Sequence, residues 1–262
     1  MKKMIFWVVT AVSLMFFSVS AFSSDETHYL PDEVSEFTSG SLEGRPLIKF
    51  VSDVSLRSFH PLGYKRGAKR AMFGDIDLQK DDKGFFIKDV YCNIKVRSRV
   101  GPDKIPTNSI MNAEHTWPQS KGARREPFRG DLHHLFPTDS RANSTRSSHL
   151  FGEVIGRPVR EKDCTASKVG KMMHPETGKA LGRHAYQPPV GHRGNVARAL
   201  FYAAVSYGYK ISELEEHYLK KWHEEDPVDA SEMQRNEEIQ EAQGNRNPFV
   251  DFPEMVSRVS DF

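Results

Sequence analysis

Cysteine is nearly absent from this chain of 262 residues, which contains only Cys92 and Cys164. Two cysteines exclude a disulfide-rich scaffold and every metal site built from three or four thiolates. One disulfide between them is plausible in an exported protein. The sequence leaves their pairing open, because it does not show whether they lie close together.

Long apolar segments are missing after the first twenty residues. The chain opens with Lys2 and Lys3, an apolar run from Met4 to Val19, and small residues up to Ala21. This run is short for a bilayer span and polar sequence follows it, which predicts a cleaved signal peptide over residues 1–21. We therefore expect residues 22–262 to form a single domain that is secreted or periplasmic, monomeric and free of the membrane.

Internal repeats, low-complexity linkers and the common hydrolase motifs are also missing. Ser147, Ser148 and His149 lie in no GXSXG elbow, which argues against a serine hydrolase. The chain also has no HEXXH motif. A zinc hydrolase acting on peptides or cell wall stays open as an alternative, with its ion held by residues from two segments: Glu114, His115, His133 and His134.

Charge is unevenly distributed along the chain. Residues 101–200 contain sixteen Lys and Arg against nine Asp and Glu, a net charge of +7. Residues 201–262 contain six Lys and Arg against fourteen Asp and Glu, a net charge of −8. A basic block of this kind suits a surface that meets polyphosphate, although a solvated face balanced by acidic helices has the same composition.

Residue patterns in the middle of the chain predict strands followed by a helix. The stretch GFFIKDVYCNIKV (84–96) is rich in aromatic and β-branched residues and predicts a strand or hairpin. SIMNAEHTWP (109–118) and DLHHLFP (131–137) predict two short extended segments. A helix is expected in TDSRANSTRSS (138–148), with Thr138 as its N-cap.

The remaining pattern is mostly helical, which makes the expected fold α+β. A helix is expected around Leu47–Phe59, and apolar spacing predicts another in GNVARALFYAAVSYGYK. Ser212 with Glu215 predicts a capping box for the helix that ends before Pro227. Asp229 is expected to begin a last helix that ends at Gly244, with residues 226–241 mostly solvated.

Glu114 and His115 stand side by side in the basic block, close to residues able to assist phosphodiester hydrolysis. A neutral histidine can take a proton from water, and a hard divalent ion can neutralise phosphate charge and stabilise the leaving oxygen. Asn143 offers an amide oxygen to the same ion as Glu114, and such an oxygen set suits Mg²⁺, Mn²⁺ or Ca²⁺. Neighbours on an extended strand point to opposite sides, however, so both side chains cannot meet at one atom there.

Several longer segments together resemble the endonuclease I family of secreted or periplasmic nucleases. They stand in the family's order, cover most of residues 85–254, and read NAEHTWPQS, GDLHHLFPTDSRANSTRSS, FGEV, RGNVARALFYAAVSYGY, LKKWHEEDPVDASEMQRNEEIQ and GNRNPFVDFPE. The resemblance implies a ββα-metal core with additional C-terminal helices. It also implies metal-dependent, sequence-nonspecific cleavage of DNA, and often of RNA, through phosphate contacts, with 5′-phosphate products.

The resemblance implies roles for individual residues. His115 matches the general base, and Glu114 and Asn143 match the two protein ligands of the metal. Asp131 and His133, with His134 beside them, are expected to support this site from behind, although they could simply pin two segments together.

The segment between the Glu-His pair and DLHH departs from the family, because it is short and leaves the family's assisting arginine unassigned. Arg129 is the first candidate for that catalytic role, with Arg124 and Arg125 as alternatives. The residues expected to contact nucleic acid are Arg124, Arg125, Arg141 and Arg146. An exported nucleic-acid-binding protein without catalysis is the second alternative that the sequence leaves open.

Overall fold

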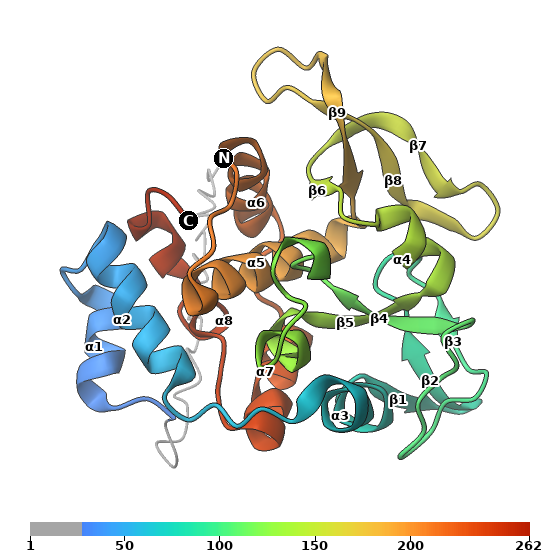
Figure 1. Ribbon diagram of the computed structural model, residues 1–262, viewed down its shortest axis with the longest axis horizontal. Helices are drawn as coiled ribbons and strands as arrows, with labels where there is room; N and C mark the ends of the chain where they lie inside the picture. The colour runs from blue at the N-terminus through green and yellow to red at the C-terminus, as the bar shows by residue number, and fades with distance from the viewer. Residues whose placement is uncertain (1–27) are drawn as a thin grey trace, which may run out of the picture.

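The computed structural model describes residues 28–262, so the expected signal peptide of residues 1–21 lies outside the described residues. The described part combines helices with small, mostly antiparallel sheets, which confirms the α+β fold (Figure 1). None of the helices in this part is long and apolar enough to cross a membrane.

The N-terminal part contains two helices, a helical segment with π-helical turns, and a small sheet. Helix α2 ends at Leu56, so the helix expected around Leu47–Phe59 is confirmed with an earlier end. The hairpin expected in residues 84–96 is also confirmed, because β2 pairs with β3. The elements are α1 (Pro31–Ser39), α2 (Gly44–Leu56), η1 (Gly63–Ala68), α3 (Lys69–Ala71), η2 (Met72–Ile76), β1 (Leu78–Asp81), β2 (Gly84–Lys88) and β3 (Lys95–Val96).

The middle of the chain forms an antiparallel hairpin followed directly by a short helix. Strand β4 (Met111–His115) pairs with β5 (Leu135–Asp139), and α4 (Ser140–Arg146) begins where β5 ends. The second extended segment was predicted too early, because Leu132–His134 is a 3₁₀ turn (η5) whose N-cap is the Asp131 side chain. Two further 3₁₀ turns, η3 (Gln119–Lys121) and η4 (Phe128–Gly130), lie between the strands.

The N-cap of α4 is Asp139 rather than Thr138. The Asp139 carboxylate accepts from the backbone N–H groups of Arg141 and Ala142 at 3.0 and 2.9 Å. Thr138 is still part of β5, and its hydroxyl donates to Asp89 at 2.8 Å. The expected helix therefore starts two residues later and is shorter than the stretch 138–148.

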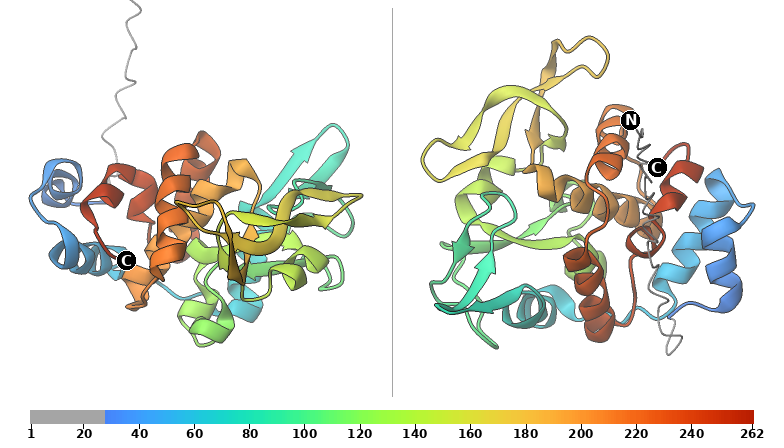
Figure 2. Two further views of the ribbon diagram at one scale, coloured as in Figure 1. Left: turned by 90° about the horizontal axis from the view of Figure 1, so that it is seen from above. Right: turned by 180° about the vertical axis from the view of Figure 1, so that it is seen from behind.

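A four-stranded sheet over residues 150–187 was not anticipated from the sequence. Its order is β6-β9-β8-β7, with β6 and β9 parallel and the other pairs antiparallel. Figures 1 and 2 show that its outer loops project from the body of the molecule, at the opposite end from α1 and α2. Cys92 and Cys164 form a disulfide that ties the β2–β3 connection to this sheet. The strands are β6 (Leu150–Phe151), β7 (Val154–Arg160), β8 (Cys164–Met173) and β9 (Ala180–Gln187).

Helix α5 runs through the centre of the molecule (Figure 1). Twelve of its fifteen residues are buried, so it is covered on all sides instead of presenting the single apolar face that its sequence spacing predicts. The larger hydrophobic core forms around it and combines residues from Tyr29 to Phe262. The C-terminal elements are η6 (Val190–His192), α5 (Arg193–Tyr207), α6 (Glu213–Glu225), α7 (Ala230–Gln243), α8 (Pro248–Asp251) and η7 (Pro253–Arg258).

The predicted caps of the last helices are partly correct. Asp229 caps α7, and Gly244 ends it in the left-handed region at φ 86°. Ser212 makes no side-chain bond at the start of α6, and Glu215 accepts instead from the Phe151 backbone at 2.8 Å. One face of α7 is buried, including Glu232 at 8% exposure, so residues 226–241 are less solvated than predicted.

Candidate functional site

The ββα unit opens onto a cleft that brings together the three residues predicted to do the chemistry. Glu114 and His115 come from the end of β4 and Asn143 from α4, and all three line this cleft of about 690 Å³. A second cleft of about 840 Å³ adjoins it, because Ala113 and Asn143 line both. Below, these are the first and second cleft.

Glu114 is a buried carboxylate with one occupied oxygen. Its Oε1 accepts from the Tyr91 hydroxyl at 2.8 Å and lies 3.2 Å from the Arg146 guanidinium. Its Oε2 has no hydrogen-bond partner within residues 28–262. Burial raises the pKa of Glu114, against the lowering effects of Arg146 and the Tyr91 hydrogen bond. A positive charge at the free oxygen would favour the ionised form.

His115 is held in one tautomer by its surroundings. Its Nε2 lies 3.0 Å from the carbonyl oxygen of Arg129, which can only accept, so Nε2 carries the proton. Its Nδ1 lies 3.3 Å from the Gln119 amide nitrogen and therefore presents a lone pair. Burial lowers the pKa of His115 to about 3, and the nearby His134 and Arg129 act in the same direction. The imidazole is thus a neutral acceptor at ordinary pH.

Glu114 and His115 are neighbours in β4 and their side chains point apart, yet both line the first cleft. Glu114 points toward Tyr91 and Arg146, while His115 turns toward the Arg129 carbonyl and packs on Tyr64 at 4.9 Å between ring centroids. They therefore approach the first cleft from two sides. Asn143 is partly exposed on α4, where it lines both clefts.

Arg146 was expected to contact nucleic acid, and the structure contradicts this. Its side chain is 1% exposed, and its guanidinium donates to the carbonyl oxygens of His115 at 3.2 Å and Thr116 at 2.6 Å. It also neutralises Glu114 and stacks on Phe151. Arg146 therefore fastens α4 to the end of β4 and positions the site from within. The other three arginines expected to contact nucleic acid are exposed: Arg124, Arg125 and Arg141.

Arg129 lies beside His115 and lines the second cleft. Its guanidinium stacks on the Tyr64 ring at 4.6 Å, and its buried Nε has no hydrogen-bond partner among the described residues. Sequence reasoning missed Tyr64, Lys65 and Lys69, which line the same cleft. The stretch YKRGAKR (64–70), with its lysines and arginines beside a tyrosine, was the available signal.

Asp131 and His133 form a buried cluster behind the cleft. Asp131 accepts four hydrogen bonds, from the backbone of His133 and from the side chains of Gln243, Tyr202 and Tyr207. His133 Nε2 lies 3.0 Å from the Asn245 carbonyl oxygen. These bonds pin the DLHH turn to α5 and to the end of α7, the simpler of the two roles predicted for this stretch.

His134 is the member of this stretch that reaches His115. Their rings pack edge to face at 5.4 Å, and His134 Nε2 lies 2.7 Å from the Phe128 carbonyl oxygen. Because His115, His133 and His134 all direct Nε2 at backbone carbonyls, they do not converge on one ion. No group of three or more His, Cys, Asp or Glu able to hold a metal exists within residues 28–262. The zinc site considered from the sequence is therefore not formed.

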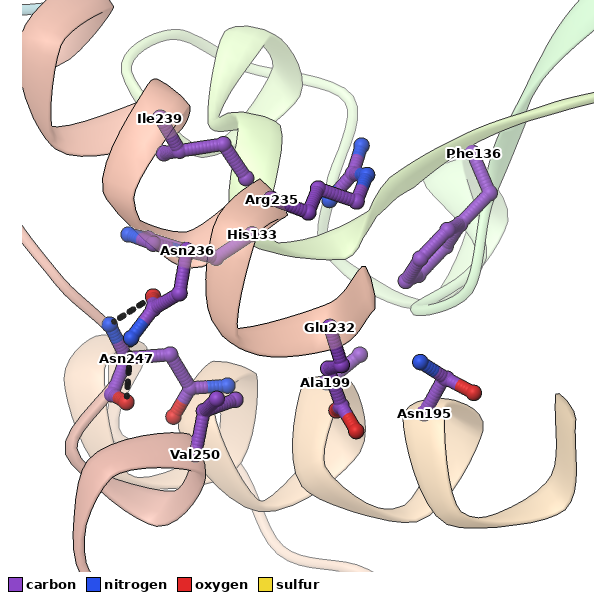
Figure 3. A pocket seen from close by; sticks show the side chains of 10 residues that line it. All are labelled: His133, Phe136, Asn195, Ala199, Glu232, Arg235, Asn236, Ile239, Asn247 and Val250. Atoms are coloured by element: carbon purple, nitrogen blue, oxygen red, sulfur yellow. Dashed lines mark hydrogen bonds between the residues drawn. The ribbon is translucent and has the colours of Figure 1, made fainter. Parts of the chain in front are cut away.

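A smaller cavity is lined by His133 (Figure 3). It lies between α5, α7, α8 and β5, and its lining includes Asn195, Arg235 and Asn236. Of the residues predicted for the site, only His133 lines it. The cavity therefore belongs to the packing between helices rather than to the cleft at Glu114.

Comparison with known proteins assigns the family. The family model described as Endonuclease I matches residues 56–254, more than half of the chain. The chain belongs to the endonuclease I family. The endonuclease I match includes Glu114, His115 and Asn143 and the whole segment that forms the two clefts.

Individual relatives carry nuclease names. An extracellular ribonuclease of Bacillus amyloliquefaciens is 33% identical over 169 residues, which cover 56% of this chain and 53% of that protein. A periplasmic deoxyribonuclease of Aeromonas hydrophila is 30% identical over 132 residues, which cover 50% of this chain and 51% of that protein. Endonuclease-1 of Buchnera aphidicola is 29% identical over 120 residues, which cover 46% of this chain and 44% of that protein. The chain spans about half the length of the curated relatives it matches.

Proposed function

We propose that the chain is a metal-dependent, sequence-nonspecific endonuclease that hydrolyses phosphodiester bonds of DNA, and of RNA, to 5′-phosphate products. The observation that carries the proposal is the first cleft, where a carboxylate, an amide and a neutral histidine of fixed tautomer meet. Membership of the endonuclease I family supports it. The relatives' names, ribonuclease and deoxyribonuclease, support the two substrates.

Glu114 and Asn143 fit a hard divalent cation. Glu114 offers a free Oε2 in a buried setting, and the Asn143 side chain has no hydrogen-bond partner within residues 28–262. One carboxylate and one amide oxygen match the ligands of Mg²⁺, with Mn²⁺ or Ca²⁺ as alternatives. When bound, such an ion supplies charge neutralisation for the phosphate and for the departing 3′-oxygen.

His115 acts as the general base in this proposal. The Arg129 carbonyl holds the Nε2 proton, so Nδ1 can take a proton from a water that replaces the Gln119 amide at its lone pair. The Gln119 amide, 3.3 Å from Nδ1, marks where that water would be received. In-line attack by this water breaks the bond to the 3′-oxygen and leaves the phosphate on the 5′ side.

Positive side chains around the cleft provide the contacts to the substrate. Arg129 is the candidate for stabilising the negative charge that develops on the phosphate, because it lies beside His115 with an unpartnered Nε. The exposed Arg124, Arg125 and Arg141 are candidates for contacts to neighbouring phosphates. Phosphate contacts carry no base information, so cleavage is expected to be independent of sequence.

Export fits this activity. Relatives named extracellular and periplasmic nucleases support secretion or periplasmic retention after cleavage near Ala21. We also propose that the mature chain works as a monomer that binds nucleic acid through its phosphates.

The experiment is plasmid cleavage by the His115→Ala variant at saturating Mg²⁺. Loss of the base should slow cleavage by about a hundred- to ten-thousand-fold while the fold, followed by circular dichroism, stays intact. His217→Ala, an exposed histidine on α6, is the matched control and should cut at the wild-type rate. Normal cleavage by His115→Ala would refute the assignment of the base, and DNA binding without cleavage by the wild type would indicate a binding protein.

A further inference from the structure

The second cleft contains two lysines, Lys65 and Lys69, that the proposed chemistry does not use. Lys65 and Lys69 line it together with Arg129, and of the described residues that line it none is acidic. None of these three cations forms an ion pair with a carboxylate of residues 28–262. Nine of the nineteen arginines in the described part do have such a partner, for example Arg97 with Asp81 and Arg235 with Asp77. The cleft therefore carries uncompensated positive charge.

The Tyr64 ring packs against two cations of this cleft and against the predicted base His115. Its ring contacts the Arg129 guanidinium at 4.6 Å, the Lys69 ammonium at 5.3 Å and the His115 ring at 4.9 Å. The Tyr64 backbone N–H donates to Glu126 at 2.9 Å, which fixes the start of the helical segment 63–76. Lys69 is positioned further by its Nζ, which donates to Asn108 at 3.3 Å.

Like charges are held together here although they repel. Lys69 is half-buried, and burial together with the charge of Arg129 lowers its pKa. Cations gathered without a carboxylate partner repel one another, so the arrangement suits a site for an anion that arrives with the ligand. Amide groups of Asn108, Asn112 and Gln119 add hydrogen-bond donors to the lining.

We propose that the second cleft binds a phosphate of the substrate strand next to the phosphate that is cleaved, with Lys69 and Lys65 as its main contacts and Tyr64 as the support of Lys69. The two clefts share Ala113, Gln119 and Asn143, so one strand passing the scissile position enters the second cleft directly. This inference rests on the proposed nuclease function and adds a second phosphate position to it. A substrate with a single phosphodiester leaves this position empty.

Binding of a fluorescent single-stranded 12-mer, measured by anisotropy in EDTA at several salt concentrations, tests the site without catalysis. Lys69→Gln should weaken binding about tenfold at low salt and flatten the plot of log K against log salt by about 0.7, the value for one phosphate contact. Lys69→Arg should restore both the affinity and the slope of this plot to the values of the wild type. Arg66→Gln is the matched control, because Arg66 is exposed on the same helical segment outside the cleft, and it should change binding by less than half as much.

Kinetic measurements then distinguish a phosphate site in the second cleft from nonspecific electrostatic attraction between the protein and the strand. Lys69→Gln should raise KM for the 12-mer about tenfold with kcat unchanged, and should leave cleavage of a dinucleoside monophosphate as in the wild type. Equal effects of Lys69→Gln and Arg66→Gln on binding, or no effect of Lys69→Gln, would overturn the site. If the wild type cuts neither substrate but the binding differences appear, the phosphate site stands and the nuclease proposal fails.

Discussion

At the scale of single residues, the site depends on how two neighbours of one strand are oriented. Glu114 and His115 end β4, and each is oriented by a different partner, Arg146 for the carboxylate and the Arg129 carbonyl for the imidazole. The residue types were readable from the sequence because carboxylate, imidazole and amide are the groups that such chemistry needs. Arg146 was misjudged, since its long side chain passes through the core instead of reaching solvent.

The pH dependence of cleavage follows from the environment of His115. The base must be neutral, so activity falls as protonation sets in, and burial has moved the pKa from 6.5 to about 3. We expect kcat/KM for a short DNA substrate at saturating Mg²⁺ to reach half its maximum at a pH well below 6.5.

Glu114 needs attention in this measurement, because burial raises its pKa and protonation of the carboxylate weakens metal binding. Saturating metal removes this contribution, and circular dichroism at each pH separates it from acid unfolding. An acid limb centred at 6.5 or above, in a folded protein, would show that His115 titrates as an ordinary histidine.

At the scale of elements, the hairpin and the helix that follows it were predicted, but their boundaries were not. The Asp131 side chain accepts from a backbone N–H group and begins a 3₁₀ turn where a strand had been expected. The Asp139 side chain likewise begins α4, for which Thr138 had been expected as the N-cap. Such bonds depend on a carboxylate meeting a particular N–H group, which sequence periodicity does not reveal. The sheet of residues 150–187 was missed because its strands mix glycines and charges and pair partly over long range.

Substitution of Asp131 tests whether its hydrogen bonds join the DLHH turn to α5 and α7. Asp131→Ala leaves the hydroxyls of Tyr202 and Tyr207 without an acceptor, while Gln243 keeps its bond to Asn245, and the free energy of unfolding should fall by about 3 kcal/mol. Urea denaturation measures this, with Asp163→Ala as control, because Asp163 is an exposed carboxylate paired only with Arg160. If Asp131→Ala keeps its stability but loses affinity for Mg²⁺, the residue supports the metal site and does not pin segments.

At the scale of the whole molecule, the strands and helix that carry the site, β4, β5 and α4, lie between a helical body and smaller sheets (Figures 1 and 2). The core around α5 combines residues from both ends of the described chain, which supports our proposal that residues 22–262 form one domain. The Cys92–Cys164 disulfide, which the sequence left open, joins segments 72 residues apart next to the ββα unit. Helices of the C-terminal third were the best predicted elements, since apolar spacing and the Asp229 and Gly244 caps are local signals, although the Ser212 cap is not made.

The most direct measurement is nicking of supercoiled plasmid by the purified mature protein with Mg²⁺, then with excess EDTA, then with Mg²⁺ restored. Our account predicts cleavage with the metal at sites unrelated to sequence, loss of cleavage in EDTA, and recovery when Mg²⁺ is added back. It also predicts 5′-phosphate ends on the products. Cleavage that continues unchanged in EDTA would contradict a metal held by Glu114 and Asn143 and, with it, the central claim.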